Sequence, residues 1–218
     1  MKKKPILIFD FDGTLVNTID ESLSFINGLS KEFNFPFVDK KKEKYLRSLP
    51  LTDSVKILGL SNWDLIQILW RLKKNLNQKI PFFKPYDDVV KGLNILKKSN
   101  FSLLIVTFNS LKTVNKFLKF NKIDFFDDII SCNVFFGKER ALKRVLRNHS
   151  LSSREALYIG DEIRDIIACQ KINLPILSVS YGINNSENLA LFKPAFLVDN
   201  FSQVVNVINL YQKENFKI

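Results

Sequence analysis

Short apolar runs alternate along the chain with stretches in which apolar residues return every three or four positions. A short apolar run bounded by polar residues predicts a buried strand, and the longer period predicts an amphipathic helix. Strands that alternate with helices are typical of βα units around a parallel sheet, so the pattern predicts an α/β fold. The predicted strands are Ile6–Phe9, Leu103–Thr107, Ile129–Cys132, Ala156–Ile159, Ile176–Val179 and Phe196–Val198.

The segment between the first two predicted strands shows helical patterns only. Ser61 and Asp64 resemble a capping box at the start of one of its helices. Trp63 and Trp70 lie at helical spacing, and we expect them in the apolar core of this segment. The predicted helices are a stretch through Leu15, Ile19, Leu23 and Ile26, a second over Thr52–Leu58, and a third from Ser61 through Leu76.

Two prolines, Pro81 and Pro85, interrupt the helical pattern. Proline removes a backbone donor and clashes with the preceding helical turn, so we expect the inserted segment to end there. A further helix then starts at Asp87 and Asp88 and is expected to bury Val89, Val90, Leu93 and Leu96. The sequence therefore predicts a helical insert between the first and second strands.

Two carboxylates, Asp10 and Asp12, directly follow the first predicted strand. Residues two apart on an extended chain share a face, so both should meet at the strand's carboxyl end, where open α/β sheets bind ligands. A cation such as Mg2+ would offset their repulsion, and one carboxylate could attack phosphorus while the other moves protons. The pair alone is equally compatible with a strand end that faces solvent and carries two acidic residues.

Four segments together carry a family resemblance. Asp10-Phe11-Asp12-Gly13-Thr14 resembles the first signature of the haloacid dehalogenase-like (HAD) phosphohydrolase superfamily. The other signatures of that family are matched in order by Thr107 after Leu103–Val106, by Lys138 in Phe136-Gly137-Lys138-Glu139, and by Gly160-Asp161 with Asp165.

The resemblance covers essentially the whole chain. It implies a Rossmann-like, three-layer parallel sheet, the HAD-like core, with a small inserted all-α cap domain. The core would comprise residues 1–15 and 85–218, and the cap residues 16–84. Among phosphate-acting members, the chain is most similar to the phosphoglycolate phosphatase-like group, with β-phosphoglucomutases as neighbours.

The chemistry that this resemblance implies is Mg2+-dependent hydrolysis of a phosphomonoester through an aspartyl-phosphate. The first carboxylate attacks phosphorus, and the second protonates the leaving alkoxide and then activates water. A second acid favours phosphate esters over dehalogenation, because a halide leaving group needs no proton. The resemblance assigns catalysis to Asp10, Asp12, Thr107 and Lys138. It assigns metal binding to Asp10, Asp12, Asp161 and Asp165, and Asp12 would bind the metal through its backbone carbonyl.

Four further residues are candidates for roles in or beside the site. Members of the family commonly have Asn or Ser after the position of Thr107, whereas this chain has Phe108 and then Asn109, both expected beside the phosphoryl group. Arg47 is either a substrate-binding residue that faces a carboxylate or a solvated residue at a helix end. Glu162 either holds a metal-bound water or caps the following helix, and we favour the cap.

Composition limits the alternatives. The 218 residues contain one histidine, His149, and two cysteines, Cys132 and Cys169, which leaves little for triad or zinc chemistry. Both cysteines lie in or beside predicted buried elements, so free thiols in a reducing, cytoplasmic setting are expected. The first apolar run breaks at Asp10, too early for a signal peptide, and no stretch approaches a membrane span.

The net charge of +11 raises the alternative of a non-catalytic, basic nucleic-acid-binding protein. The lysines of this chain are scattered, and no nucleic-acid-binding signature accompanies them. We therefore expect the partner to be a small phosphorylated metabolite and not nucleic acid. A β-phosphoglucomutase-like phosphotransferase would keep the same four signatures and is the other alternative. Either a monomer or a homodimer is compatible with the sequence.

Overall fold

The computed structural model describes residues 4–49, 51–132 and 137–215. Phe136, quoted above with Lys138, lies outside these residues, as do the ends of the predicted core, residues 1–3 and 216–218.

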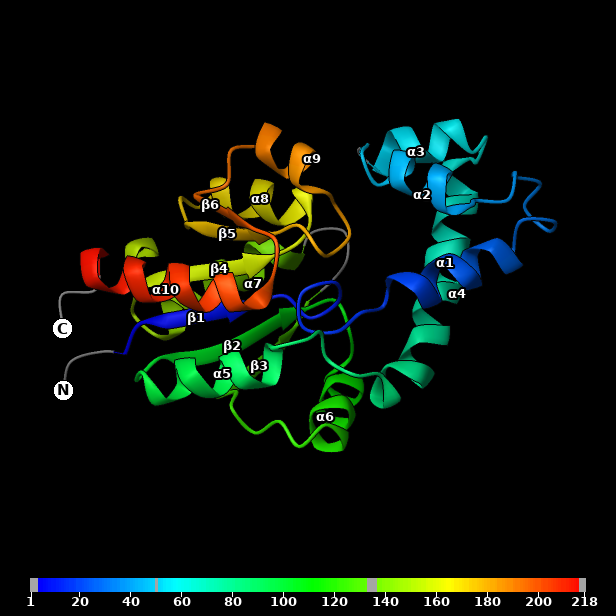
Figure 1. Ribbon diagram of the computed structural model, residues 1–218. Coiled ribbons are helices and arrows are strands. Elements are labelled where there is room, and N and C mark those ends of the chain that lie inside the picture. Colours follow the sequence, from blue (N-terminus) through cyan, green and yellow to red (C-terminus); the bar gives the residue numbers. More distant parts are fainter. Residues whose placement is uncertain (1–3, 50, 133–136, 216–218) are drawn as a thin grey trace.

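A six-stranded parallel sheet forms the centre of the molecule, with strand order β3-β2-β1-β4-β5-β6 (Figure 1). Each strand begins and ends within one residue of its predicted limits, so the α/β prediction is confirmed. The strands are β1 (Ile6–Phe9), β2 (Ser102–Thr107), β3 (Asp128–Ser131), β4 (Ala156–Gly160), β5 (Ile176–Val179) and β6 (Phe196–Val198).

Strand β1 is buried on both faces because its four residues are all apolar. Alternate side chains of a strand point to opposite faces, so Leu7 and Phe9 join one core cluster and Ile6 and Ile8 join another. Helices α5 (Val89–Lys98), α6 (Leu111–Phe120) and α10 (Phe201–Asn215) pack on the first cluster. Helices α7 (Gly137–Asn148), α8 (Ile163–Gln170) and α9 (Ser186–Leu191) pack on the second, and η2 (Ser153–Glu155) precedes β4.

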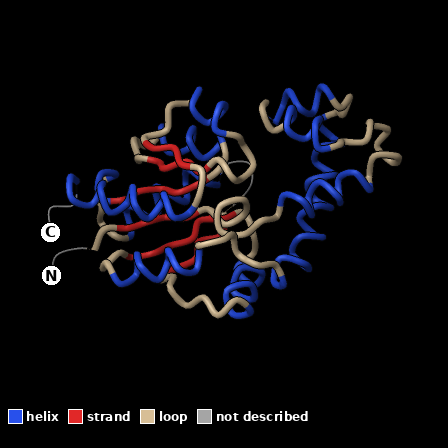
Figure 2. The backbone as a smooth tube through the Cα atoms, in the orientation of Figure 1, coloured by secondary structure: helices blue, strands red, loops and turns tan. Residues whose placement is uncertain are grey.

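The chain between β1 and α5 is helical and lies beyond the carboxyl ends of the strands (Figures 1 and 2). It has its own small core of Phe35, Val38 and Ile68. The division at residues 15/16 and 84/85 stays a prediction. The helices are α1 (Ile19–Gly28), α2 (Lys40–Leu46), α3 (Leu51–Ile57), α4 (Asn62–Lys79) and the short 3-10 helix η1 (Ile80–Phe82).

The sequence pattern missed helix α2. Its residues read Lys-Lys-Lys-Glu-Lys-Tyr-Leu and show no apolar period. The helix starts instead at a cap, where the side chain of Asp39 accepts a hydrogen bond from the backbone N–H of Lys42 at 2.7 Å. Side-chain capping of this kind satisfies a backbone donor that has no partner in the first turn.

The prediction that Trp63 and Trp70 belong to the core of the insert is wrong. Both lie on α4 and are 67% and 65% exposed. The buried face of α4 passes through Ile68 and Leu76. Trp63 precedes Ile68 by five residues, and at 3.6 residues per turn this spacing puts the two side chains on different sides of the helix.

A smaller correction concerns α5. Val90 was expected on its buried face but is 37% exposed, because that face runs through Val89, Leu93 and Leu96.

Cys132 and Cys169 are both free thiols, the first half-buried and the second buried. No helix in the described part of the chain is long and apolar enough to cross a membrane.

Candidate active site

The candidate residues meet at the carboxyl ends of three neighbouring strands. Strand β1 lies between β2 and β4. Asp10 therefore follows the central strand, where its backbone N–H donates to the carbonyl of Ile159 on β4 at 2.8 Å. Thr107 closes β2, and Asp161 directly follows β4. Parallel pairing thus brings together residues that are far apart in the sequence, such as Asp10 and Asp161.

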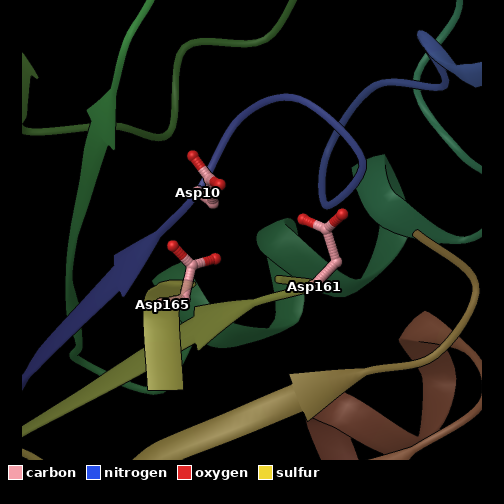
Figure 3. Close-up of side chains that lie close together, drawn as sticks. All are labelled: Asp10, Asp161 and Asp165. Carbon is pink, nitrogen blue, oxygen red and sulfur yellow. The ribbon is translucent and has the colours of Figure 1, made fainter. Parts of the chain in front are cut away.

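Three buried carboxylates form the centre of the site. One oxygen each of Asp10, Asp161 and Asp165 lies within 4.8 Å of the others. Figure 3 shows the three side chains converging from the end of β1, the end of β4 and the first turn of α8. Each of the three residues is at most 4% exposed.

Lys138 supplies the cation that contacts this cluster. Its Nζ donates to Asp10 Oδ2 at 2.8 Å and to Asp165 Oδ1 at 2.5 Å. Burial opposes the charge of the lysine, but the carboxylates of Asp10 and Asp165 raise its pKa well above the ordinary value. Lys138 is therefore a fixed positive charge beside the predicted nucleophile.

The site holds more negative groups than Lys138 can neutralise. Burial is the largest cause that raises the pKa of Asp10 and of Asp161. Burial also raises the pKa of Asp165 to about 7, against the opposing charge of Lys138. Converging carboxylate oxygens are the ligands that Mg2+ prefers, so the residues present fit a divalent cation.

We expect the metal-free protein to lose stability as the pH rises from about 4 to about 7. The carboxyl pKa values of Asp12 and Asp165 are about 7 in the folded protein, against an ordinary 3.8. The folded state therefore holds more protons than the unfolded chain between these values, and deprotonation favours unfolding.

Melting temperatures across this pH range in EDTA measure that effect. Added Mg2+ should flatten the decline, because a bound cation stabilises the charged carboxylates. A melting temperature that climbs steadily from pH 4 to pH 7 in EDTA would contradict the predicted sign.

Asp12 occupies a different environment from the three-carboxylate cluster. Its Oδ2 accepts a hydrogen bond from the side-chain amide of Asn109, while its Oδ1 is buried without a hydrogen-bond partner in the described structure. Burial and then the charge of Glu162 raise its pKa to about 7, against Lys138, the Asn109 bond and Lys73. A carboxyl group with such a pKa can donate a proton at neutral pH and take one back.

The carboxylate of Asp161 is held in place from two sides. Thr14 Oγ1 donates to its Oδ1 at 2.7 Å, and the backbone N–H of Ile183 donates to its Oδ2 at 2.7 Å. Gly13 passes close to the same carboxylate with φ +73°, a conformation that favours glycine. Thr14 was not selected from the sequence as a site residue, although it stands in the quoted Asp-x-Asp-Gly-Thr signature.

The residues after β2 form a turn beside Lys138. Thr107 is fully buried, and its hydroxyl accepts a hydrogen bond from the backbone N–H of Asn109 at 3.0 Å. The Phe108 ring lies 4.9 Å from Lys138 Nζ and 5.4 Å from the guanidinium carbon of Arg164. Phe108 therefore contacts two cations of the site through its ring.

Glu162 is the N-cap residue of α8, the position that we favoured from the sequence. Its carboxylate accepts two hydrogen bonds from the guanidinium of Arg164, at 2.7 and 2.9 Å. Arg164 was not among the candidate residues. Arg164 lies in the first turn of α8, two positions after Glu162, and this spacing gives no signal of the pairing before the fold is known.

Arg47 joins the helical insert to the core. Its Nε donates to the carbonyl of Ile183 at 2.7 Å, and its Nη2 donates to the carbonyl of Gly182. Its own carbonyl accepts hydrogen bonds from the side-chain amides of Asn184 and Asn188. Arg47 thereby contacts the loop whose Ile183 holds Asp161.

Comparison with known proteins identifies the family. The model of the haloacid dehalogenase-like hydrolases matches residues 7–179. The chain belongs to this family. The predicted family, the α/β fold and the predicted class of enzyme, a HAD-like phosphatase, are confirmed.

Relatives of this HAD-family chain extend over nearly its whole length. It is 24% identical over 209 residues to a phosphoglycolate phosphatase of Synechococcus elongatus, covering 95% of the chain and 99% of the relative. It is 27% identical to the pyrophosphatase PpaX of Bacillus cereus, covering 93% and 95%. A solved haloacid dehalogenase-like family protein of Streptococcus pneumoniae has the same fold, with a TM-score of 0.76, 22% identity, and coverage of 95% and 100%.

Proposed function

We propose that this HAD-family enzyme is a Mg2+-dependent phosphatase that hydrolyses a small phosphorylated metabolite through an aspartyl-phosphate on Asp10. The observation that carries the proposal is the buried cluster of Asp10, Asp161 and Asp165 with Lys138 between two of its members. The similarity to a phosphoglycolate phosphatase supports the class of substrate. The enzyme would act in the cytoplasm.

Each step can be assigned to a residue of the chain. Asp10 attacks phosphorus in line, and Asp12 donates a proton to the leaving alkoxide. Asp12 then takes a proton from the water that hydrolyses the acyl-phosphate. Lys138 and the Thr107 hydroxyl stabilise the charge that develops on the phosphoryl oxygens, helped by the backbone amide of Phe108.

The metal would be held by Asp10, the backbone carbonyl of Asp12, Asp161 and Asp165. When bound, Mg2+ would polarise the phosphoryl group and neutralise its charge. Asn109 would orient the Asp12 side chain, to which it donates a hydrogen bond.

Phosphate release from a panel of metabolites, with and without Mg2+, tests the proposal. The panel includes 2-phosphoglycolate, sugar phosphates, inorganic pyrophosphate and nucleoside monophosphates. Hydrolysis that requires Mg2+ supports a phosphatase. Transfer of the phosphoryl group to a second sugar hydroxyl would identify a mutase, and salt-sensitive retention of RNA without hydrolysis would favour a nucleic-acid-binding role.

Arg47 has two candidate roles, binding a substrate carboxylate or holding the helical insert on the core. Two of its donors already bind the carbonyls of Gly182 and Ile183, so we expect Arg47→Ala to raise KM about equally, by roughly tenfold, for substrates with and without a carboxylate. Arg71→Ala is the matched control, since Arg71 pairs with Glu32 within the insert. A rise confined to 2-phosphoglycolate would instead assign Arg47 to the substrate.

A further inference from the structure

Two large aromatic side chains on α4 lie exposed. Trp63 and Trp70, the only tryptophans of the chain, are 67% and 65% exposed, and Ile66 between them is 42% exposed. The three are spaced so that they share one side of the helix, away from the buried Ile68. Neighbouring exposed apolar side chains commonly mark a surface that binds a ligand or a partner.

Near the C-terminal end of α4, this side of the helix contacts the catalytic core. Asn77 Oδ1 accepts a hydrogen bond from Thr113 Oγ1 on α6 at 2.9 Å. Trp70 precedes Asn77 by seven residues, which is two helical turns and about 10 Å along the same side of the helix. Helix α6 begins at Leu111, directly after the turn that carries Thr107 and Asn109.

A lysine side chain lies beside Trp70. Lys74 Nζ lies 5.6 Å from the centre of a Trp70 ring. Lys73 lies one turn from Trp70 on α4, and its charge opposes the rise in the Asp12 pKa that burial causes. Farther along α4, a pocket of about 500 Å³ between α4 and α6 is lined by Asn77 and by three lysines, Lys74, Lys112 and Lys116. Trp70 is not among its lining residues, and neither is a carboxylate of the described chain, so the pocket extends the positive charge beyond Lys74 toward α6.

We propose that Trp70, flanked by Lys73 and Lys74, binds the leaving group of the substrate, and that this group carries a planar, heteroaromatic ring, as in a nucleoside monophosphate. The inference rests on the proposed phosphatase function and names its substrate class. A ring stacks on the indole, while the two ammonium groups attract the anionic ligand. Trp63 lies two turns farther from the contact with α6 and is not part of this subsite.

Tryptophan fluorescence tests the subsite without relying on turnover. In an Asp10→Asn background, Trp63→Phe leaves Trp70 as the only tryptophan, and Trp70→Phe leaves Trp63. We expect uridine 5′-monophosphate to quench the Trp63→Phe protein saturably and to leave the Trp70→Phe protein unchanged. Ribose 5-phosphate, which lacks only the base, should quench neither.

Kinetics with the same pair of ligands give an independent measurement. Uridine 5′-monophosphate should have a higher kcat/KM than ribose 5-phosphate in the parent enzyme. Trp70→Ala should lower this preference about 5- to 150-fold, the range expected for losing one stacked base, and Trp63→Ala should leave it unchanged.

The outcomes separate the two proposals. Mg2+-dependent hydrolysis without base preference and without quenching would overturn the subsite while supporting the phosphatase. Saturable quenching of Trp70 with no hydrolysis of any phosphomonoester would support the subsite and overturn the phosphatase. Equal quenching of Trp63 and Trp70 would show non-specific association with α4 and would also overturn the subsite.

Discussion

Asp10→Asn is expected to reduce Mg2+-dependent phosphate release by at least about a thousandfold, because an amide cannot form the acyl-phosphate. The substitution keeps the size of the side chain and an oxygen to accept the Phe11 N–H, which Asp10 Oδ1 accepts at 2.8 Å. It also removes one negative charge from a cluster that has an excess of them. We therefore expect the fold to persist, as circular dichroism and thermal melting would show.

Asp124→Asn is the matched control, since Asp124 is an exposed carboxylate of the core and lies away from the strand ends that carry the site. It should leave turnover within about twofold, as most exposed substitutions do. Mass spectrometry of acid-quenched protein should detect a phosphorylated peptide containing Asp10 in the parent and none in Asp10→Asn. Turnover of Asp10→Asn within tenfold of the parent would exclude Asp10 as the nucleophile.

The strands and the residues at their ends could be predicted because their signals are local. The apolar run Ile6–Phe9 ends at Asp10 in the sequence and in the structure alike. Parallel pairing then determines that residues following β1, β2 and β4 lie at one edge of the sheet. The proximity of Asp10, Asp161 and Asp165 follows from these two facts together, and the structure shows it.

Other features depend on contacts that a linear pattern does not contain. Helical spacing shows that Trp63 and Trp70 share a face, but only the packing of Ile68 shows that this face is the exposed one. The pairing of Phe108 with Arg164 joins the end of β2 to α8. Such contacts are set by the tertiary fold, so sequence spacing gives no signal for them.

The pKa values of the site carboxylates also depend on contacts that the sequence does not show. Asp12 is one of two neighbouring acids in the sequence, and nothing there distinguishes their pKa values. In the structure, Asp10 contacts Lys138, whereas Asp12 contacts the neutral amide of Asn109. Burial raises the pKa of both carboxyl groups, but the Lys138 cation opposes that rise at Asp10 and favours the charged form that the proposed nucleophile needs. The pKa of about 7 at Asp12 suits the proposed general acid, which must be protonated to donate. The proposed division of roles thus depends on the surroundings of each carboxylate, which the sequence does not contain.

Gly13→Ala is expected to lower kcat/KM by at least about a hundredfold, the cost of displacing a catalytic group by about 1 Å. A Cβ at this position would lie 2.1 Å from Asp161 Oδ2. That carboxylate cannot turn away without losing its hydrogen bonds to Thr14 and Ile183. We therefore expect the variant to lose most of the increase in melting temperature that Mg2+ gives the parent.

Gly59→Ala separates this clash from backbone strain. Gly59 has φ +72°, close to the +73° of Gly13, but a Cβ there would meet no described atom within 4 Å. Each substitution should cost about 1–2 kcal/mol of stability for a side chain in the left-handed region. Only Gly13→Ala should also lose turnover and Mg2+-dependent stabilisation, because only its new methyl group meets Asp161. Equal activity in the two variants would mean that the Asp161 carboxylate is not held at this position during catalysis.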